Sequence, residues 1–277
     1  MTPRSIIAVL LSATFVLRAG GVYAAGANTP DTIGTRTESQ KLAGELLAGM
    51  AKYLAALQGF EVELVGSYDA VQESGQKIEF SEVRAVAVAR PDRLRVERLR
   101  SDGAEDLIVF DGKTMHVFDG RVGVFAQAPQ PGSLDDAVVY FVRELGMQLP
   151  LAALLSTRFP AELERRVRTV DYVEYTEILP VPAHHIAGRT GTVDFQVWIA
   201  DGDQPLPLRI VITYVNEPGQ PQFRAQFLGW KQAPPVDASL FRFSPPADAR
   251  QIAFAVQVPD IAAGVATPAT GPKAGQP

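Results

Sequence analysis

Two long stretches of this sequence alternate apolar and polar residues with a period of two, and a segment of helical character separates them. Before residue 133, the alternating segments are 60–68, 77–90, 93–99, 105–110, 114–118 and 122–127. After residue 168, they are 169–179, 183–189, 192–200, 206–215 and 222–230. Successive side chains of a β-strand point to opposite faces, so each segment is typical of a strand with one buried face. The alternation restricts the chain to a fold built mainly on β-sheet.

Tight turns connect many of these segments. Asp-Gly pairs stand at 102–103, 111–112, 119–120 and 201–202. Such pairs accept positive φ and favour two-residue hairpins, which join antiparallel neighbours. About eleven strands are too many for a flat open sheet, so we expect the sheet to curl.

Helical periodicity marks the other folded segments. Within 39–57, apolar residues recur every three or four positions, at Leu42, Leu46, Met50, Tyr53 and Leu57. Ser133 stands three residues before Asp136, which predicts an N-cap that opens a second helix. Shorter helices are expected from Pro150 and over 161–168.

The apolar stripes of these helices need a surface to cover, and a curved sheet offers one in its concavity. We therefore predict an α+β fold that is mainly β. It is a strongly curved antiparallel half-barrel of about eleven strands, with helices covering the concave face. The half-barrel domain is expected to occupy residues 39–254.

The first 24 residues have the order of a secretory signal. A basic start with Arg4 is followed by an apolar run over 5–17 and by small residues that predict cleavage after Ala24. A helix of that run rises about 20 Å, which is short of a bilayer core of about 30 Å and disfavours a membrane anchor. With no cysteine to acylate, we expect a soluble periplasmic protein without a lipid anchor.

Both flanks of the domain are expected to lack stable structure. Residues 25–38 are polar with proline and glycine, which indicates a flexible lead-in. Residues 255–277 are rich in Ala, Gly, Pro and Thr and have no periodic apolar face, which predicts a disordered tail.

Composition and motifs exclude several function classes. The net charge is −5, which disfavours nucleic-acid binding through bulk charge. Neither a G-x-S-x-G nor an H-E-x-x-H motif is present. His184 and His185 are adjacent in a strand and should face opposite sides, so they suit one metal ion poorly, and His116 stands alone. We predict no catalytic residue, no metal site and no cofactor; a hydrolase without a recognisable motif remains an alternative.

Two segments of the first block resemble the family of the periplasmic lipoprotein carrier LolA and its receptor LolB. One is the basic-proline strand end at 90–95, and the other is the strand, Asp-Gly-Lys hairpin and aromatic-rich strand at 108–119. Arg90 matches the carriers' arginine before proline, so the resemblance implies that it helps latch lid helices. Val96 stands where the carriers have a tryptophan in the next strand.

Segments of the second block resemble the DUF2092 group of predicted periplasmic proteins, which we associate with the same superfamily. They are 194–199, 201–207, 211–214 and 221–230. This resemblance covers about residues 39–254, whereas the likeness to the carriers extends over 84–127.

The resemblance implies an apolar inner surface that holds acyl chains or another lipophilic ligand. Its candidate lining residues are Leu46, Met50, Phe141, Leu145, Phe195, Val197, Ile210, Tyr214, Phe223 and Phe227. The same side chains would also suit an ordinary core. Trp198 and Trp230 fall on the polar side of their strands.

The predicted function is therefore a secreted, non-catalytic carrier or binding protein. Its partner would be a lipophilic small molecule or an acylated protein, with transient contact with membrane-bound envelope proteins as a further option. We expect a monomer. The alternative is a cell-envelope sensor or interaction module with the same fold and a filled core.

Overall fold

The computed structural model describes residues 37–145, 151–232 and 237–254. The first block contributes β1 (Gly59–Val71), β2 (Lys77–Ala89), β3 (Arg93–Arg100), β4 (Glu105–Phe110), β5 (Thr114–Asp119) and β6 (Val124–Pro129). The second contributes β7 (Thr169–Thr176), β8 (Ala183–Arg189), β9 (Val193–Ala200), β10 (Pro207–Tyr214) and β11 (Gln222–Gln232). A further strand, β12, is Arg250–Gln251.

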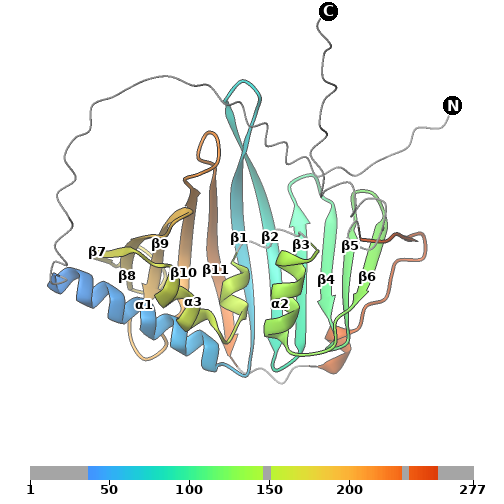
Figure 1. Cartoon of the computed structure of the whole chain (residues 1–277), viewed down its shortest axis with the longest axis horizontal. Helices are drawn as coiled ribbons and strands as arrows, with labels where there is room; N and C mark the ends of the chain where they lie inside the picture. The colour runs from blue at the N-terminus through green and yellow to red at the C-terminus, as the bar shows by residue number, and fades with distance from the viewer. Residues whose placement is uncertain (1–36, 146–150, 233–236, 255–277) are drawn as a thin grey trace, which may run out of the picture. The chain divides into compact units, whose positions relative to one another are not determined.

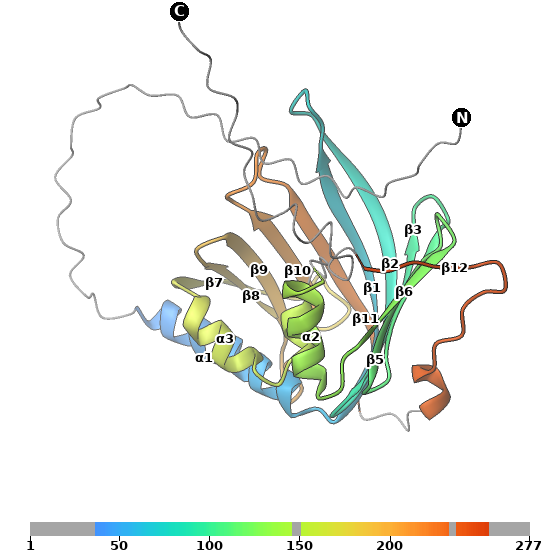
Figure 2. The same ribbon diagram turned by 45° about the vertical axis from the view of Figure 1, so that its right-hand side comes forward.

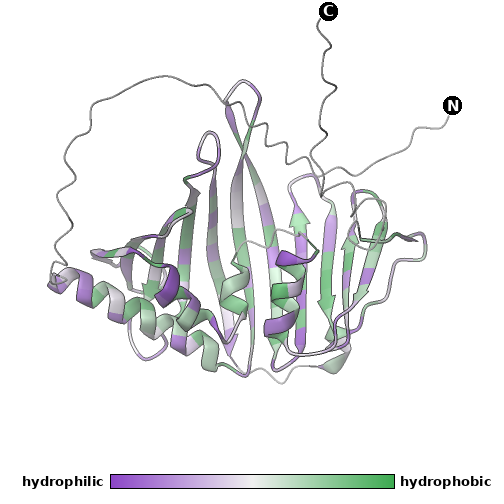
Figure 3. Ribbon diagram, viewed as in Figure 1, coloured by the Kyte–Doolittle hydropathy of each residue, from purple (hydrophilic) through white to green (hydrophobic). Residues whose placement is uncertain are grey.

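All of these strands form one curved sheet in the order β12-β6-β5-β4-β3-β2-β1-β11-β10-β9-β8-β7 (Figure 1). The two alternating blocks meet where β1 pairs antiparallel with β11. Hydrophobic and hydrophilic residues alternate along the strands (Figure 3), as expected for a sheet with one buried face. The predicted strongly curved antiparallel sheet is confirmed.

One strand departs from the expectation. β12 is a twelfth strand and pairs in parallel with β6, as Arg250 with Val124. Two residues are too few to display a period of two, so alternation could not have predicted this strand.

Helices form where the spacing predicted them. They are α1 (Glu38–Ala56), α2 (Leu134–Arg143), the short 3₁₀ helix η1 (Ala152–Leu155) and α3 (Phe159–Arg166). A further 3₁₀ helix, η2 (Ala238–Phe241), was not predicted. The Thr37 side chain accepts a hydrogen bond from the Gln40 backbone and the Ser133 side chain one from the Asp136 backbone. These caps satisfy backbone N–H groups that the first helical turn leaves unpaired.

The helices other than η2 cover one face of the sheet. α1 and α3 lie across the strands of the second block and α2 lies in front of the first block (Figures 1 and 2). One continuous core fills the space between helices and sheet. Its members include Met50 of α1, Phe141 of α2, Phe110 of β4 and Val197 of β9. The predicted helical cover of the concave face is confirmed.

A bulge in β11 changes which side chains face that core. Glu63 pairs with Leu228 but Glu61 pairs with Lys231, so β11 carries one extra residue there. Gly229 has φ +62°, which glycine adopts without strain. The expected polar-side position of Trp230 is wrong, because the bulge turns its indole towards the core, where it packs.

The C-terminal strap, residues 237–254, runs from the convex face to the sheet edge. Arg95 of β3 donates from Nη1 to the carbonyl oxygen of Leu240 in η2 at 3.1 Å. Phe243 stacks on His116, with ring centroids 4.8 Å apart. Phe254 is buried in a small cluster with Ala126 and Ala128 of β6. The strap thus covers the outer side of an edge strand whose backbone would otherwise be unpaired.

Several expectations fall outside the described residues. These are the signal peptide at 1–24, most of the lead-in at 25–38, the helix start at Pro150 and the tail at 255–277. They remain predictions.

Candidate ligand-binding site on the concave face

Strand register decides which side chains share the concave face. Phe60, Leu64 and Tyr68 of β1 lie on this face, and across from them on β11 lie Phe227 and Phe223. Leu64 pairs with Phe227 and Tyr68 with Phe223, so the rings and aliphatic chains form one apolar track along the two strands.

The helices leave a small cavity of about 40 Å³ beneath η1. It is lined by Phe60, Val62, Leu64, Arg84, Val86, Val96, Leu151, Leu154, Leu155, Phe227 and Trp230. A space of that size holds a few water molecules at most and no acyl chain. Side chains therefore fill most of the space beneath η1 in this structure.

Arg90 ties two helical ends to the turn after β2. Its Nε donates to the carbonyl oxygen of Leu57 at 2.9 Å, and its Nη1 donates to that of Leu155 at 2.8 Å. These carbonyls end α1 and η1, where a cation is favoured. Burial lowers the pKa of Arg90, against the opposite effect of Asp135. The geometry suits the latch that the family resemblance implies, and the latch role itself remains a prediction.

A row of charged side chains crosses the concave face beyond the cavity. We call the charged row the six residues Glu82, Arg84, Arg98, Arg100, Asp106 and Asp119. Arg84 Nη2 lies 2.5 Å from Glu82 Oε1, and Arg98 Nη2 lies 2.5 Å from Asp106 Oδ2. Arg100 completes the row with Nε 2.6 Å from Asp106 Oδ2.

The sequence patterns did not single out the charged row as part of a site. The Arg100 side chain is only 17% exposed. Burial acts to lower the pKa of Arg100, but the neighbouring carboxylates of Asp106 and Asp119 outweigh it, so the pKa is raised. The period of two could have indicated this row, because Arg98 and Arg100 lie on the same face of β3 as Leu94, and a leucine is expected to face the core.

Beyond the charged row, the apolar track opens to solvent. Tyr68 and Phe80 form a stacked cross-strand pair, with ring centroids 5.9 Å apart. Tyr68 is 38% exposed, and Phe80 and the nearby Ile78 are each 39% exposed. Exposed aromatic surface next to a covered apolar face is typical of a binding surface.

The ten predicted lining residues all belong to one core cluster or pack against it. Those buried in it are Met50, Phe141, Val197, Ile210, Phe223 and Phe227, and those packed against it are Leu46, Leu145, Phe195 and Tyr214. Among them, Phe227 lines the cavity beneath η1. Their role towards a ligand remains a prediction, whereas Trp230 and Arg84 were not predicted and line that cavity.

The two adjacent histidines have separate surroundings. His184 Nε2 lies 3.1 Å from Asp201 Oδ1, while His185 stacks on Trp198 with ring centroids 4.0 Å apart. In the part of the chain that the structure describes, no three acidic or histidine side chains gather as a metal site would require.

A model of one protein family matches residues 43–255, and its description is that of a predicted periplasmic protein, DUF2092. The chain belongs to the DUF2092 family. The resemblance identified in the second block of strands is thereby confirmed for most of this DUF2092 protein. No curated protein sequence matches the chain.

Solved structures similar to this DUF2092 protein are distant from it. An uncharacterized conserved protein from Thermus thermophilus is 16% identical, with a TM-score of 0.45 over 76% of this chain and 99% of the other. The lipoprotein LppX of Mycobacterium tuberculosis is 15% identical, with a TM-score of 0.45 over 72% and 100%. In the MucA/MucB complex of Pseudomonas aeruginosa, the matched chain is 19% identical, with a TM-score of 0.39 over 73% and 61%.

No helix within 37–145, 151–232 or 237–254 is both long and apolar enough to cross a membrane.

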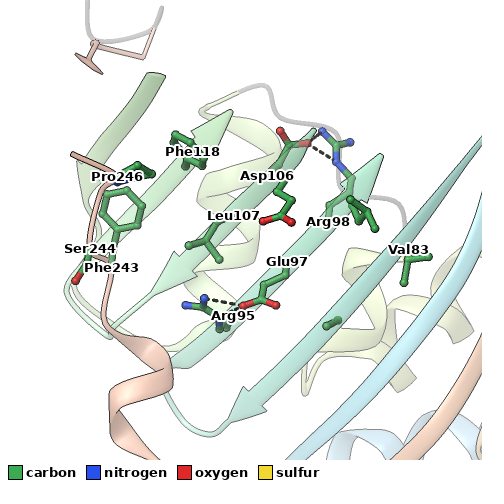
Figure 4. Close-up of a pocket in the computed structure, with 13 residues that line it drawn as sticks. Val83, Arg95, Glu97, Arg98, Asp106, Leu107, Phe118, Phe243, Ser244 and Pro246 are labelled. Carbon is green, nitrogen blue, oxygen red and sulfur yellow. Dashed lines mark hydrogen bonds and ion pairs between the residues drawn. The ribbon is translucent and has the colours of Figure 1, made fainter. Parts of the chain in front are cut away.

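The DUF2092 protein also has an open groove of about 410 Å³ on its convex face, between the sheet and the C-terminal strap (Figure 4). Leu107, Phe118 and Phe243 contribute apolar surface. The charges there are paired, with Arg95 Nη2 2.6 Å from Glu97 Oε1. None of the buried unpaired polar atoms of the described residues belongs to this groove. The concave face is therefore the better candidate site.

Proposed function

We propose that this DUF2092 protein is a non-catalytic periplasmic binding or carrier protein for a lipid, acyl chain or other lipophilic ligand. The observation that carries the proposal is the apolar track on β1 and β11. It runs from Phe60 beneath the helices to Tyr68, which is exposed to solvent. An apolar concave surface that is partly covered by helices is the usual setting of a small-molecule site.

In the proposed mechanism, η1 moves away from the sheet and an acyl chain takes its place along the track. Burial of the chain supplies about 0.8 kcal/mol per methylene. Arg90 holds the closed state through its bonds to Leu57 and Leu155, so it sets how readily the helices open. Closing over the ligand would return these bonds and shield the chain from water.

The proposal includes export by a signal peptide over residues 1–24, after which the mature chain acts without a lipid anchor. N-terminal sequencing of secreted material tests this part. A mature N-terminus near residue 25 is expected, and an intact Met1 in the periplasmic fraction would contradict it.

A second candidate function is a sensor or protein-interaction module with a filled core. The size of the cavity favours it, since about 40 Å³ beneath η1 leaves no room for a chain in the closed state. This candidate predicts that the helices stay closed and that a protein partner, rather than a lipid, binds the exposed surface.

Lipid extraction and a binding assay distinguish the two candidates. The protein is purified without detergent, its organic extract is analysed by mass spectrometry, and a fluorescent fatty-acyl probe is titrated into it. Co-purified lipid and saturable probe binding support the carrier. Their joint absence rejects the carrier and leaves the interaction module.

A matched pair of variants locates the binding. Leu154 is buried at the cavity and Val139 is 39% exposed on α2. We expect Leu154→Phe to fill the cavity and weaken probe binding about tenfold, while Val139→Phe leaves it unchanged. Equal affinities of the two variants would place any binding elsewhere.

A further inference from the structure

Among the described residues, Arg84 is the one charged residue that lines the cavity beneath η1. It lies on β2 and is 7% exposed, and the other lining residues are aliphatic or aromatic. In an apolar site, the few polar groups fix the orientation of the ligand. The place of Arg84 therefore marks where the polar end of a ligand would lie.

The side chain of Arg84 has a donor to spare. Its Nη2 contacts Glu82, and its guanidinium carbon lies 5.5 Å from the ring centre of Phe223. Its buried Nε has no hydrogen-bond partner within the described residues. A buried N–H without an acceptor is unfavourable, so an oxygen brought next to it would be bound.

The charge of the surroundings selects the kind of oxygen. The charged row contains three arginines, Arg84, Arg98 and Arg100, and three carboxylates, Glu82, Asp106 and Asp119. The guanidiniums are already balanced, so an ionised head would add an uncompensated charge to a buried place. An ester, ether or hydroxyl oxygen accepts the Nε–H bond without that cost.

We infer that Arg84 Nε binds the uncharged, oxygen-bearing head of a long-chain ester or alcohol whose tail lies along the apolar track. The inference rests on the proposed function and narrows its ligand class. Acylglycerol-like molecules are selected, and ionised fatty acids are disfavoured.

A comparison of two probes with the same acyl tail tests whether the site prefers an uncharged head group to an ionised one. Trp230 lines the cavity and Trp198 is the second tryptophan of the chain, so Trp198→Phe leaves one reporter at the site. In this background, 1-monolauroylglycerol and laurate are titrated at pH 8 and the fluorescence of Trp230 is followed. We expect the glyceride to bind about tenfold more tightly.

Two double variants, each of which leaves the net charge unchanged, test whether Arg84 binds the head group. Glu82→Met with Arg84→Met removes the donor and its counter-charge together, a replacement that buried ion pairs often tolerate. Arg95→Met with Glu97→Met removes an ion pair of the same i,i+2 spacing from the convex face of β3, outside the candidate site. We expect the first variant to bind the glyceride about tenfold more weakly and to lose the preference over laurate. The second should match the parent, and thermal unfolding of both checks that they fold.

The outcomes separate this inference from the function on which it rests. A parent protein that binds neither probe rejects the lipid-binding function and the inference with it. Binding of laurate as tightly as the glyceride, or more tightly, rejects the inference alone. If the variant at residues 82 and 84 fails to fold, the comparison of the two probes on the parent protein still decides.

Discussion

Trp230 stacks on Phe227, with ring centroids 5.6 Å apart and ring planes inclined by 14°. They stand three positions apart in β11, and a regular strand would place them on opposite faces. The bulge at Gly229 supplies the extra residue that brings both rings to the concave face. The shape of the candidate site therefore depends on one backbone conformation.

Gly229→Ala should destabilise the protein by about 1–2 kcal/mol, because φ is +62° there and an alanine is strained in that conformation. The added Cβ atom would meet no other atom within 4 Å, so it causes no clash. The cost is thus that of the backbone alone. Gly49→Ala in α1 is the control, because it also has open space around it but lies in a helix, and should stabilise by about 0.5–1 kcal/mol. Urea unfolding measures both. Similar effects of the two substitutions would argue against the bulge as the cause.

Arg90→Met should loosen η1. The substitution removes two hydrogen bonds to carbonyl oxygens and should cost about 1–3 kcal/mol of unfolding free energy. Amide hydrogen exchange should accelerate at Leu154 and Ser156, whose N–H groups bond within η1.

Arg121→Met serves as the control, because that side chain is 58% exposed in a hairpin and makes a long contact with Asp102. If exchange at η1 in the Arg90 variant equals that of the control, the latch role of Arg90 is wrong.

Asp69→Asn should show a stability loss that depends on pH. Burial acts to raise the pKa of Asp69, but hydrogen bonds from Arg224 at 2.9 Å and from the Gln222 backbone at 3.0 Å outweigh it and hold the pKa below the usual range. The carboxylate stabilises the fold above its unfolded pKa of about 3.9, and this contribution is lost as pH falls through the lower folded pKa.

We therefore expect the variant to be about 1–3 kcal/mol less stable at pH 7, with a difference that shrinks below about pH 3. Guanidinium unfolding at both pH values measures it. A difference that stays constant with pH would show that Asp69 acts through its shape and not its charge.

Most of the fold could be predicted because local patterns determine it. Alternation located the strands from β1 to β11, and the Ser133 cap located the start of α2 to the residue. What escaped depends on contacts distant in sequence. β12 is held by pairing to β6, and the strap of residues 237–254 by the docking of Phe243 on His116.

The candidate site was less predictable than the fold, for physical reasons. Apolar residues face a core and a ligand cavity alike, so Phe227 and Met50 could not be told apart by pattern. Arg84 and Glu82 violate the rule that charges face water, and their pairing becomes visible only when register places them on the concave face. Trp230 faces the core because of a bulge in β11, and the alternation of apolar and polar residues does not reveal a bulge.

Phe243→Ala should release His116 from the cover of the strap. Burial lowers the pKa of His116, against the opposing effect of Asp111, and the stacked ring of Phe243 provides part of that burial. A lowered pKa means that the neutral ring stabilises the fold above about pH 6.5 and that this stability is lost as pH falls through the folded pKa. In the variant, NMR titration should show the pKa of His116 rising towards its usual value, with a weaker acid dependence of stability. His185, stacked on Trp198, is the internal control in the same spectra. An unchanged titration of His116 would mean that the sheet alone, without the strap, buries this ring.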